Sequence, residues 1–307
     1  MQSMTADTWL AGTPRVSVLM TIYNAAKFLR ESVDSLLAQS FPDWELIAVE
    51  NGSTDESASI LAEYIDPRVR VFPFSENIGR TPALRYAFGH ARGEYIAILD
   101  ADDVAHPNRI ARQVEFMIQN AEVALLGSWA IQINERGEKI AELMPPTDQS
   151  ELRDLLGWAN PIVHSSSMYH RERARQVGGY PTRLTYAQDY GLLLELAQRH
   201  TVAVLGEFLC YHRVFPTQMS KSRKYQRVIA EEQIYLFQYA MATLDLSVQS
   251  QRLNRRSQAL AEMRRGMASF SDGKYLIGLM EIIIAVAKSP SALWGNGPVR
   301  RFLGAGI

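Results

Sequence analysis

The sequence lacks most features of secreted, disulfide-bonded or metal-cluster proteins. Its 307 residues contain one cysteine, Cys210, so no internal disulfide can form and a reducing compartment is expected. The first twelve residues, MQSMTADTWLAG, have neither the basic start nor the apolar core of a signal peptide. The six histidines are scattered without the spacing of a metal site. Together these absences predict a cytoplasmic protein.

Several common nucleotide-binding and catalytic motifs are also missing. Neither a G-x-G-x-x-G fingerprint nor a G-x-x-x-x-G-K-[ST] loop is present, which excludes the usual dehydrogenases and P-loop ATPases. The Gly-x-Ser-x-Gly elbow of the α/β-hydrolases is absent as well. The composition, 47% hydrophobic and 21% charged, is that of an ordinary packed globule. No nucleic-acid partner is expected.

Charge is distributed unevenly along the chain. Residues 1–220 hold 19 Lys and Arg against 27 Asp and Glu, a net charge of −8, whereas residues 221–307 hold 13 against 6, a net charge of +7. The basic tail is predicted to be either a solvated helical extension or a segment attracted to an anionic surface such as a membrane leaflet.

The first half of the chain alternates short apolar runs with helical patterns. The runs are typical of β-strands, and the segments between them repeat apolar residues every three or four positions. The predicted strands are Val16–Ile22, Trp44–Glu50, Val69–Phe74 and Tyr95–Leu99, and the predicted helices are Ala26–Gln39, Asp55–Tyr64 and Thr81–Ala91. This alternation predicts an α/β fold with a mainly parallel sheet covered by helices on both faces.

Beyond residue 121 the pattern is less regular. The predicted strands are Val123–Gly127, Trp129–Ile133, Ser165–Tyr169 and Val202–Leu205, and the predicted helices are Glu151–Leu156 and Gln188–Arg199. From residue 221 onward only helices are expected. Two helix starts have clear signals: Ser53 and Glu56 match a capping box, and Pro107 suits the first turn of a helix over residues 108–119.

The segment LDADDVAHP carries three carboxylates, Asp100, Asp102 and Asp103, directly behind a predicted strand. Neighbouring carboxylates repel one another, and a divalent cation with oxygen ligands would relieve this repulsion. Open α/β sheets bind ligands at the carboxyl ends of their strands, where this loop lies. Two alternatives remain: a solvated loop in which Asp103 caps the next helix, and the D-x-D-x-[TV] signature of aspartyl-phosphate phosphohydrolases. The latter normally follows the first strand, whereas this loop follows the fourth.

Several segments together resemble the family-two inverting glycosyltransferases of the GT-A fold, over roughly residues 14–222. The resemblance rests on segments that stand in the family's order, namely VSVLMTIYNAAKFLRESVDSLLAQSFPDWELIAVENGSTDES, NIGRTPALRYAFGHARGEYIAILDADDVAHPNRIARQVEF, NPIVHSSSMYHRE, VGGY, YAQDYGLLLEL and PTQMS. It implies a GT-A-type, Rossmann-like mixed sheet, mainly parallel and flanked by helices, with a C-terminal helical extension.

The resemblance also implies a site for a nucleotide-diphosphate sugar, with a UDP-sugar favoured. The base and ribose would be lined by Thr21, Tyr23, Glu50 and Asn51. Arg80 is a candidate for the base or diphosphate, and Asp100 for the ribose or metal. Asp102 would be the direct ligand of Mg²⁺ or Mn²⁺.

Asp189, in YAQDY, occupies the position of the family's catalytic base. Inversion requires an acceptor hydroxyl to attack opposite the departing diphosphate, so Asp189 would take its proton while the cation offsets charge on the leaving group. The acceptor implied is a growing surface glycan or a lipid-linked sugar. A non-catalytic sugar-nucleotide-binding protein is the main alternative.

Three positions depart from the family pattern. Gln188 stands where an acid often precedes the base, and Asn51 replaces a second aspartate. Phe215 stands where many relatives have a histidine, three residues before the Gln218-x-Ser220 element. Because phenylalanine cannot bind a metal, either His212 substitutes for it, or Asp102, phosphates and water hold the cation, and the second option is favoured.

The sequence is therefore divided into a glycosyltransferase domain over residues 14–220 and a helical extension over 221–307. Within the domain, residues 14–120 form the nucleotide-sugar half and 121–220 the acceptor half. Lys274–Lys288 is apolar almost all round but too short to span a bilayer, which takes about 20 residues. It is predicted to pack on protein, including a second copy in a homodimer, or to anchor residues 274–303 peripherally at the inner face of the membrane.

Overall fold

The computed structural model describes residues 12–216, 218, 222–272 and 274–289. One mixed nine-stranded sheet runs through it, with the strand order β3-β2-β1-β4-β8-β6-β9-β5 and with β7 paired to β6. The strands are β1 (Val16–Ile22), β2 (Trp44–Asn51), β3 (Val69–Phe74), β4 (Tyr95–Ile98), β5 (Val104–Ala105), β6 (Val123–Ile133), β7 (Lys139–Leu143), β8 (Met168–His170) and β9 (Thr201–Arg213).

The sheet joins a parallel part to a mixed part. β1 is central to the first part and pairs in parallel with both β2 and β4. β8 then pairs antiparallel with β4 and β6, while β6 and β9 run parallel to each other. The carboxyl ends of β1, β2 and β4 meet at one edge, which brings the polar segments that follow these strands together.

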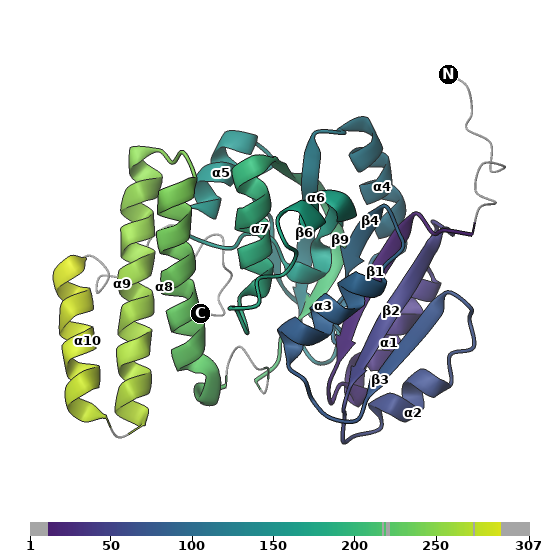
Figure 1. The fold of residues 1–307 in the computed structure, drawn as a ribbon, viewed down its shortest axis with the longest axis horizontal. Helices are drawn as coiled ribbons and strands as arrows, with labels where there is room; N and C mark the ends of the chain where they lie inside the picture. The colour runs from purple at the N-terminus through teal and green to yellow at the C-terminus, as the bar shows by residue number, and fades with distance from the viewer. Residues whose placement is uncertain (1–11, 217, 219–221, 273, 290–307) are drawn as a thin grey trace.

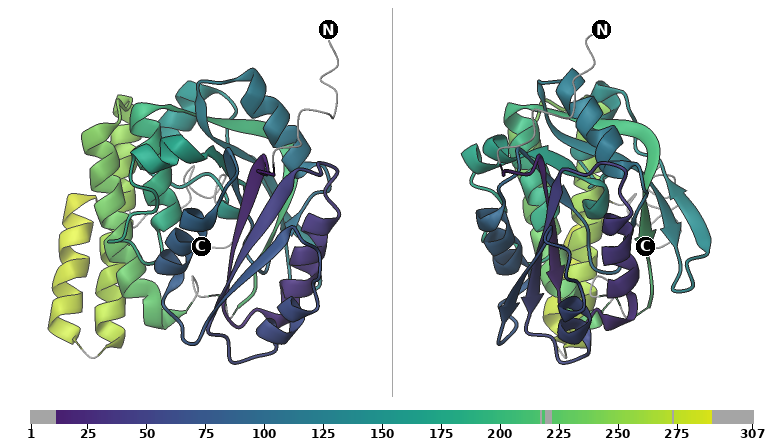
Figure 2. Two further views of the ribbon diagram at one scale, coloured as in Figure 1. Left: turned by 45° about the vertical axis from the view of Figure 1, so that its right-hand side comes forward. Right: turned by 90° about the vertical axis from the view of Figure 1, so that its right-hand side faces the viewer.

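Helices cover both faces of the sheet, as Figures 1 and 2 show. One core packs the sheet against α1 and α4, and the other packs it against α3, α5, α7 and α8. The helices of this part are α1 (Ala26–Leu37), α2 (Ser57–Ala62), α3 (Arg80–His90), α4 (Arg109–Gln119), α5 (Gln149–Leu156), α6 (Arg171–Gln176) and α7 (Gln188–Arg199). The predicted α/β architecture is confirmed, with antiparallel pairs in the second half of the sheet.

Three long helices follow, α8 (Gln226–Thr243), α9 (Val248–Ser271) and α10 (Tyr275–Lys288), and they stand side by side at the left of Figure 1. Phe237 and Leu246 belong to the same core as α7 and β1. Buried Asn254 of α9 donates hydrogen bonds to the carbonyl oxygens of Gly157 and Phe237. Helices α8 and α9 thus share the core of the α/β part. No helix in the described ranges is long and apolar enough to cross a membrane.

Several predicted boundaries and caps differ from the structure. No capping box forms at α2, because Ser53 Oγ accepts from Asn24 N and the Asp55 carboxylate accepts from Ser57 N. The strand predicted over residues 165–169 is a 3₁₀ turn, His164–Ser166, followed by the short β8. The strands predicted on either side of Ser128 are one strand, β6, which continues through a shift in its pairing with β9.

The turn at Gly52 gives a stability prediction. Gly52 has a φ of +70°, and a Cβ added there would collide with the backbone of Glu76. Gly137, in the turn between β6 and β7, has a φ of +78° but open space around it. We expect Gly137→Ala to cost about 1 kcal/mol from dihedral strain alone, and Gly52→Ala to cost roughly 2 kcal/mol or more. Denaturant unfolding checks this difference, and equal costs would contradict the steric argument.

Candidate functional site

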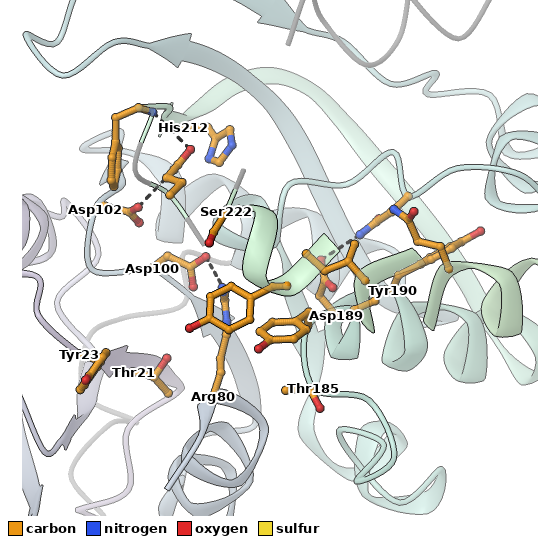
Figure 3. Close-up of a pocket in the computed structure, with 18 of the residues that line it drawn as sticks. Thr21, Tyr23, Arg80, Asp100, Asp102, Thr185, Asp189, Tyr190, His212 and Ser222 are labelled. Carbon is orange, nitrogen blue, oxygen red and sulfur yellow. Dashed lines mark hydrogen bonds and ion pairs between the residues drawn. The ribbon is translucent and has the colours of Figure 1, made fainter. Parts of the chain in front are cut away.

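A cleft of about 1220 Å³ opens at the edge where β1, β2 and β4 end, and it continues between the later helices. Its lining includes seven of the eight residues predicted from the sequence as donor or catalytic residues, namely Thr21, Tyr23, Asn51, Arg80, Asp100, Asp102 and Asp189. Figure 3 shows six of these with their neighbours; in that view Arg80 and Asp100 lie between Asp102 and Asp189. Residues separated by up to 168 positions in the sequence (21 to 189) therefore line one cavity.

The wall formed by the ends of β1 and β2 is held by loop-to-loop hydrogen bonds. Asn24 adopts a left-handed φ of 51°, and its Oδ1 accepts from Thr54 N at 2.8 Å. The backbone N–H of Asn24 in turn donates to Ser53 Oγ at 3.1 Å. These bonds tie together the two segments that follow β1 and β2. Tyr23 stays 48% exposed, so its ring is free to meet a ligand in the cleft.

Glu50 and Asn51, at the end of β2, both accept hydrogen bonds from backbone amides of nearby loops. Glu50 is buried and its Oε1 accepts from Ser53 N at 2.7 Å; it is the one predicted donor residue outside the cleft lining. Asn51 Oδ1 accepts from Ile78 N at 3.0 Å, and its Nδ2 donates to Asn77 Oδ1 at 3.1 Å. Asn51 therefore fixes the turn that leads into α3 and to Arg80.

Arg80 is the hub of the polar network in the cleft. Its Nη2 donates to Asp100 Oδ2 at 2.7 Å, and His164 Nδ1 lies 3.5 Å from the other oxygen of Asp100. Burial alone would raise the pKa of Asp100, but the charge of Arg80 and the contact with His164 hold it well below its usual range. On the opposite side, the Gln188 amide is oriented so that its oxygen accepts from Arg80 Nε at 3.1 Å. Arg80 thus links the loop after β4 to the start of α7.

The Asp103 carboxylate has its partners at the end of β9. It is buried, and its Oδ1 accepts from Arg213 N at 2.7 Å while both carboxylate oxygens lie 3.2 Å from His212 Nδ1. Burial opposes protonation of His212, yet the Asp103 carboxylate raises the pKa of His212 to about 9. The predicted alternative in which Asp103 caps the next helix is wrong, because Asp103 binds the end of β9 instead.

Asp102, the central carboxylate, is left without a cationic partner among the described residues. Its hydrogen-bond donor there is Gln218 Nε2, at 3.4 Å from Oδ2. Burial and the neighbouring charges of Asp103 and Asp100 raise the pKa of Asp102 to about 7. One oxygen of each of the three carboxylates lies within 4.8 Å of the others. A desolvated carboxylate with surplus negative charge around it fits an oxygen-preferring divalent cation.

His212 faces the Asp103 carboxylate through Nδ1. That carboxylate raises the pKa of the imidazole to about 9, so a cation that bound its Nε2 would have to displace a proton. Phe215 lines the same cleft and packs its ring 5.4 Å from that of Phe28. Ser220 lies outside the described residues. Among the described carboxylates of this loop, Asp102 is the one that no cationic side chain neutralises, and it therefore fits a cation best.

Asp189 lies in the first turn of α7, where a carboxylate is favoured by the helix dipole. Its Oδ2 accepts from Asn160 Nδ2 at 2.9 Å. The other oxygen, Oδ1, makes no hydrogen bond in the described structure and is available to accept a proton or a hydroxyl. Asn160 was not predicted from the sequence, because only the fold brings this loop residue to α7.

The loop before Asp189 is held by a residue of the C-terminal helices. The carboxylate of Glu232, on α8, accepts from the backbone nitrogens of Thr185, Tyr186 and Ala187, with the last two bonds 2.9 and 2.8 Å long. Ala187 is the N-cap of α7 and its own side chain caps nothing. Glu232 therefore caps the three backbone amides that lead into α7, the last of which belongs to the N-cap residue. No sequence signal near residue 232 marks this role, because the contact spans about 45 residues.

Comparisons with known proteins agree on one family. The profile of Glycosyl transferase family 2 matches residues 17–178, more than half of the chain. An uncharacterized glycosyltransferase of Methanocaldococcus jannaschii, MJ1057, is 33% identical over 207 residues, which cover 66% of this chain and 71% of the relative. The O-antigen biosynthesis glycosyltransferase WbnJ of Escherichia coli is 32% identical over 183 residues, 59% of this chain and 71% of WbnJ. The amylovoran biosynthesis glycosyltransferase AmsE of Erwinia amylovora is 27% identical over 231 residues, 73% of this chain and 86% of AmsE.

Solved structures share the fold. S. aureus TarS residues 1–349, crystallised in complex with UDP-GlcNAc, superposes with a TM-score of 0.66 at 19% identity, covering 91% of this chain and 81% of TarS. The mannosyltransferase PcManGT of Pyrobaculum calidifontis, in complex with GDP-Man and Mn²⁺, superposes with a TM-score of 0.59 at 20% identity, covering 95% and 79%.

The Glu232 cap generates a prediction. Glu232→Gln removes the charge and leaves a single acceptor oxygen for three amides, so we expect a loss of about 2 kcal/mol in stability. In hydrogen exchange the amides of Thr185, Tyr186 and Ala187 should lose protection while the sheet keeps it. Glu231→Gln is the matched control, since Glu231 is exposed and pairs with Arg227 on the same helix. Unchanged protection at all three amides would refute the capping role.

Proposed function

Because this chain belongs to glycosyl transferase family 2 and is a glycosyltransferase, we propose that it moves a sugar from a nucleotide-diphosphate donor to an acceptor hydroxyl with inversion at the anomeric carbon. The observation that carries this proposal is that Asp102 and Asp189 line one cleft, with the Arg80–Asp100 pair beside them. One carboxylate suits a cation and the other has an oxygen open to an acceptor. An inverting displacement needs both groups.

The donor half of the proposal places the nucleotide at the ends of β1 and β2. The exposed ring of Tyr23 and the side chains of Thr21 and Asn51 line that end of the cleft, and Glu50 supports the loop behind them. Arg80 and Asp100 are then near the ribose and diphosphate. A UDP-sugar is the favoured donor, and two proteins of the same fold have been solved in complex with UDP-GlcNAc and with GDP-Man.

The proposed cation is Mg²⁺ or Mn²⁺, with Asp102 as its protein ligand. When bound, it would supply positive charge that offsets the charge growing on the leaving diphosphate. Asp100 and Asp103 are already engaged by Arg80, His164, His212 and the Arg213 amide, so they hold the loop rather than compete for the cation. The uncompensated charge of Asp102 supports this division of roles.

Asp189 is the proposed general base. Asn160 donates to one of its oxygens and so fixes the carboxyl plane, which directs the second oxygen toward the cleft. The acceptor hydroxyl would transfer its proton to that oxygen as its own oxygen attacks the anomeric carbon. The Glu232 cap and the Gln188–Arg80 bond hold the start of α7 next to the proposed nucleotide-sugar site.

The proposed acceptor is a growing surface glycan or a lipid-linked sugar. WbnJ and AmsE are named for O-antigen and amylovoran biosynthesis, so polysaccharide assembly is the process their likeness suggests for this chain. The division into a domain over residues 14–220 and an extension over 221–307 likewise stays a proposal, since α8 and α9 share the domain's core.

Metal and donor binding are tested by thermal-shift titration with UDP, GDP, dTDP and CDP, each with and without Mn²⁺. A nucleotide at about 100 times its Kd should stabilise the protein by roughly 2.7 kcal/mol. Because the pKa of Asp102 is about 7, the cation must displace a proton below that pH, so the Mn²⁺-dependent part should be larger at pH 8 than at pH 6. Asp102→Asn should abolish it.

The same experiment separates the two carboxylates. Asp189→Asn should keep the metal-dependent shift and lower the rate of transfer by about 10²–10⁴-fold. If Asp189→Asn lost the metal-dependent shift and Asp102→Asn kept it, the two assignments would be reversed. The absence of a metal-dependent shift with every nucleotide would argue against the donor site.

We further propose that α10 contacts a membrane peripherally, within the predicted segment 274–303, of which residues 290–303 lie outside the described part. The outward side of α10 carries six apolar side chains that are 47–79% exposed, namely Leu276, Ile277, Leu279, Met280, Ile283 and Ile284. Such a face, in a C-terminal region (residues 221–307) whose net charge is +7, suits an anionic surface better than water. The alternative to membrane contact is that this face packs against a second copy of the chain in a homodimer.

Vesicle flotation tests the membrane contact. The protein should float with vesicles that contain phosphatidylserine and less with pure phosphatidylcholine. Leu276→Ser combined with Ile283→Ser should abolish flotation, whereas Ile65→Ser, at a residue 95% exposed in the loop before β3, should not change it. Failure of the unaltered protein to float, together with a concentration-dependent dimer in sedimentation that the double variant disrupts, would assign the face to a second copy instead.

A further inference from the structure

The cleft does not end at Asp189. It continues past Tyr190 and Phe237, whose rings lie 6.2 Å apart, to a region between α8 and α9. The walls there are largely apolar, with Leu260 and Met263 among the lining residues. A nucleotide sugar placed at the ends of β1, β2 and β4 would occupy the opposite end, so this extension is free for a second substrate.

One cationic side chain in this extension has no partner among the residues that the structure describes. Arg264, on α9, lines the cleft and is mostly buried, and its Nε is inaccessible to solvent and makes no hydrogen bond. No hydrogen bond or ion pair joins any of its nitrogens to a described residue. Burial lowers the pKa of Arg264, with no opposing charge beside it. A guanidinium nevertheless stays charged at neutral pH, so its desolvation is uncompensated.

Three other buried arginines of the described structure have partners. Arg80 pairs with Asp100, Arg213 pairs with Glu31, and Arg109 donates to the carbonyl oxygens of Ile98 and Ser167. Arg264 has no such partner among the described residues, and it lines the far end of the cleft. A charge left unpaired in a cavity is stabilised when an anion enters.

A second unsatisfied polar atom lies in the same extension. Gln233, on α8, lines the cleft, and its Oε1 is buried without a hydrogen-bond partner. An amide oxygen accepts hydrogen bonds, so it suits a hydroxyl of a ligand rather than its anionic group. The extension therefore presents a donor of fixed positive charge, an acceptor and an apolar wall.

We propose that this α8–α9 end of the cleft is an acceptor subsite for an amphipathic organophosphate, with the phosphate against Arg264 and the apolar part against Leu260, Met263 and Phe237. This inference rests on the proposed glycosyl transfer, because it takes Asp189 as the point where the acceptor hydroxyl reacts. Guanidinium binds phosphate oxygens in a bidentate way that a point charge does not reproduce. The lining assigns the acceptor a negative charge as well as a hydroxyl.

Calorimetry with octyl phosphate, kept below its micelle-forming concentration, tests the subsite. The unaltered protein should bind it at least ten-fold more tightly than Arg264→Gln does. Arg255→Gln is the matched control, since Arg255 is exposed on the same helix, and it should bind as the unaltered protein does. Octyl glucoside, with the same chain and no charge, should show no difference among the three. Octanoate separates phosphate recognition from attraction to any anion, and binding as tight as that of octyl phosphate would overturn the assignment to phosphate.

Stability gives an independent readout. Because Arg264 is an uncompensated buried charge, Arg264→Met should unfold at the same temperature as the unaltered protein or at a higher one. Octyl phosphate should raise the melting temperature of the unaltered protein and leave that of Arg264→Met unchanged. A marked loss of stability in Arg264→Met would show that the guanidinium is needed for folding and would overturn the inference.

The outcomes separate this inference from the proposed function. If UDP and Mn²⁺ stabilise Arg264→Gln as they do the unaltered protein but octyl phosphate binding is lost, the subsite holds whatever the rate of transfer. If transfer to glycans proceeds and octyl phosphate binds both proteins equally or neither, the function stands and the subsite is wrong.

Discussion

The ion pair between Arg80 and Asp100 determines how charge is shared in the cleft. It neutralises the first aspartate of the LDADD loop, while His212 and the Arg213 amide satisfy the third. The second aspartate is left without a cationic partner among the described residues, so burial and the charges of its neighbours raise its pKa to about 7. Two of the three carboxylates thus hold the loop in place, and Asp102 is the one proposed to bind a cation.

The guanidinium of Arg80 also contacts the start of α7. Through its Nε it meets the Gln188 amide, one residue before Asp189. Gln188 thus puts a neutral hydrogen-bond acceptor where many relatives have an acid. Its bond with Arg80 joins the start of α7 to the loop after β4. The departure from the family pattern at this position has a structural use, which the sequence alone did not reveal. The Glu232 cap then fixes the other side of the same short loop.

Much of the first half of the fold was predictable because its signals are local. The strands β1 to β4 and the helix α1 begin and end within about two residues of their predicted limits, since apolar runs and helical periodicity decide them. The capping box at Ser53 does not form because the Ser53 backbone amide donates to Glu50 Oε1 and Ser53 Oγ accepts from the backbone amide of Asn24. β6 was divided at Ser128 because the sequence does not show that a bulge opposite β9 carries the strand onward. β5 and β7 are too short or too exposed to give a signal.

The site divides in the same way. That Asp100, Asp102 and Asp189 line the cleft could be predicted, because each lies in a short motif with a position in the family. The contacts of Asn160, Glu232 and Arg264 could not, since they join elements far apart in the chain. Motifs predict which groups face the cleft, whereas the groups that hold them are visible only in three dimensions.

The cap on α7 has a consequence for modularity. The family profile ends at residue 178, before α7, and the carboxylate that orders the start of α7 comes from α8. A fragment that is to keep the start of α7 ordered must therefore extend beyond residues 17–178 and include α8. A chimera that joined this sheet to the helices of a relative would keep every motif and would still disorder the segment before Asp189, unless the incoming helix carried a carboxylate at the position of Glu232.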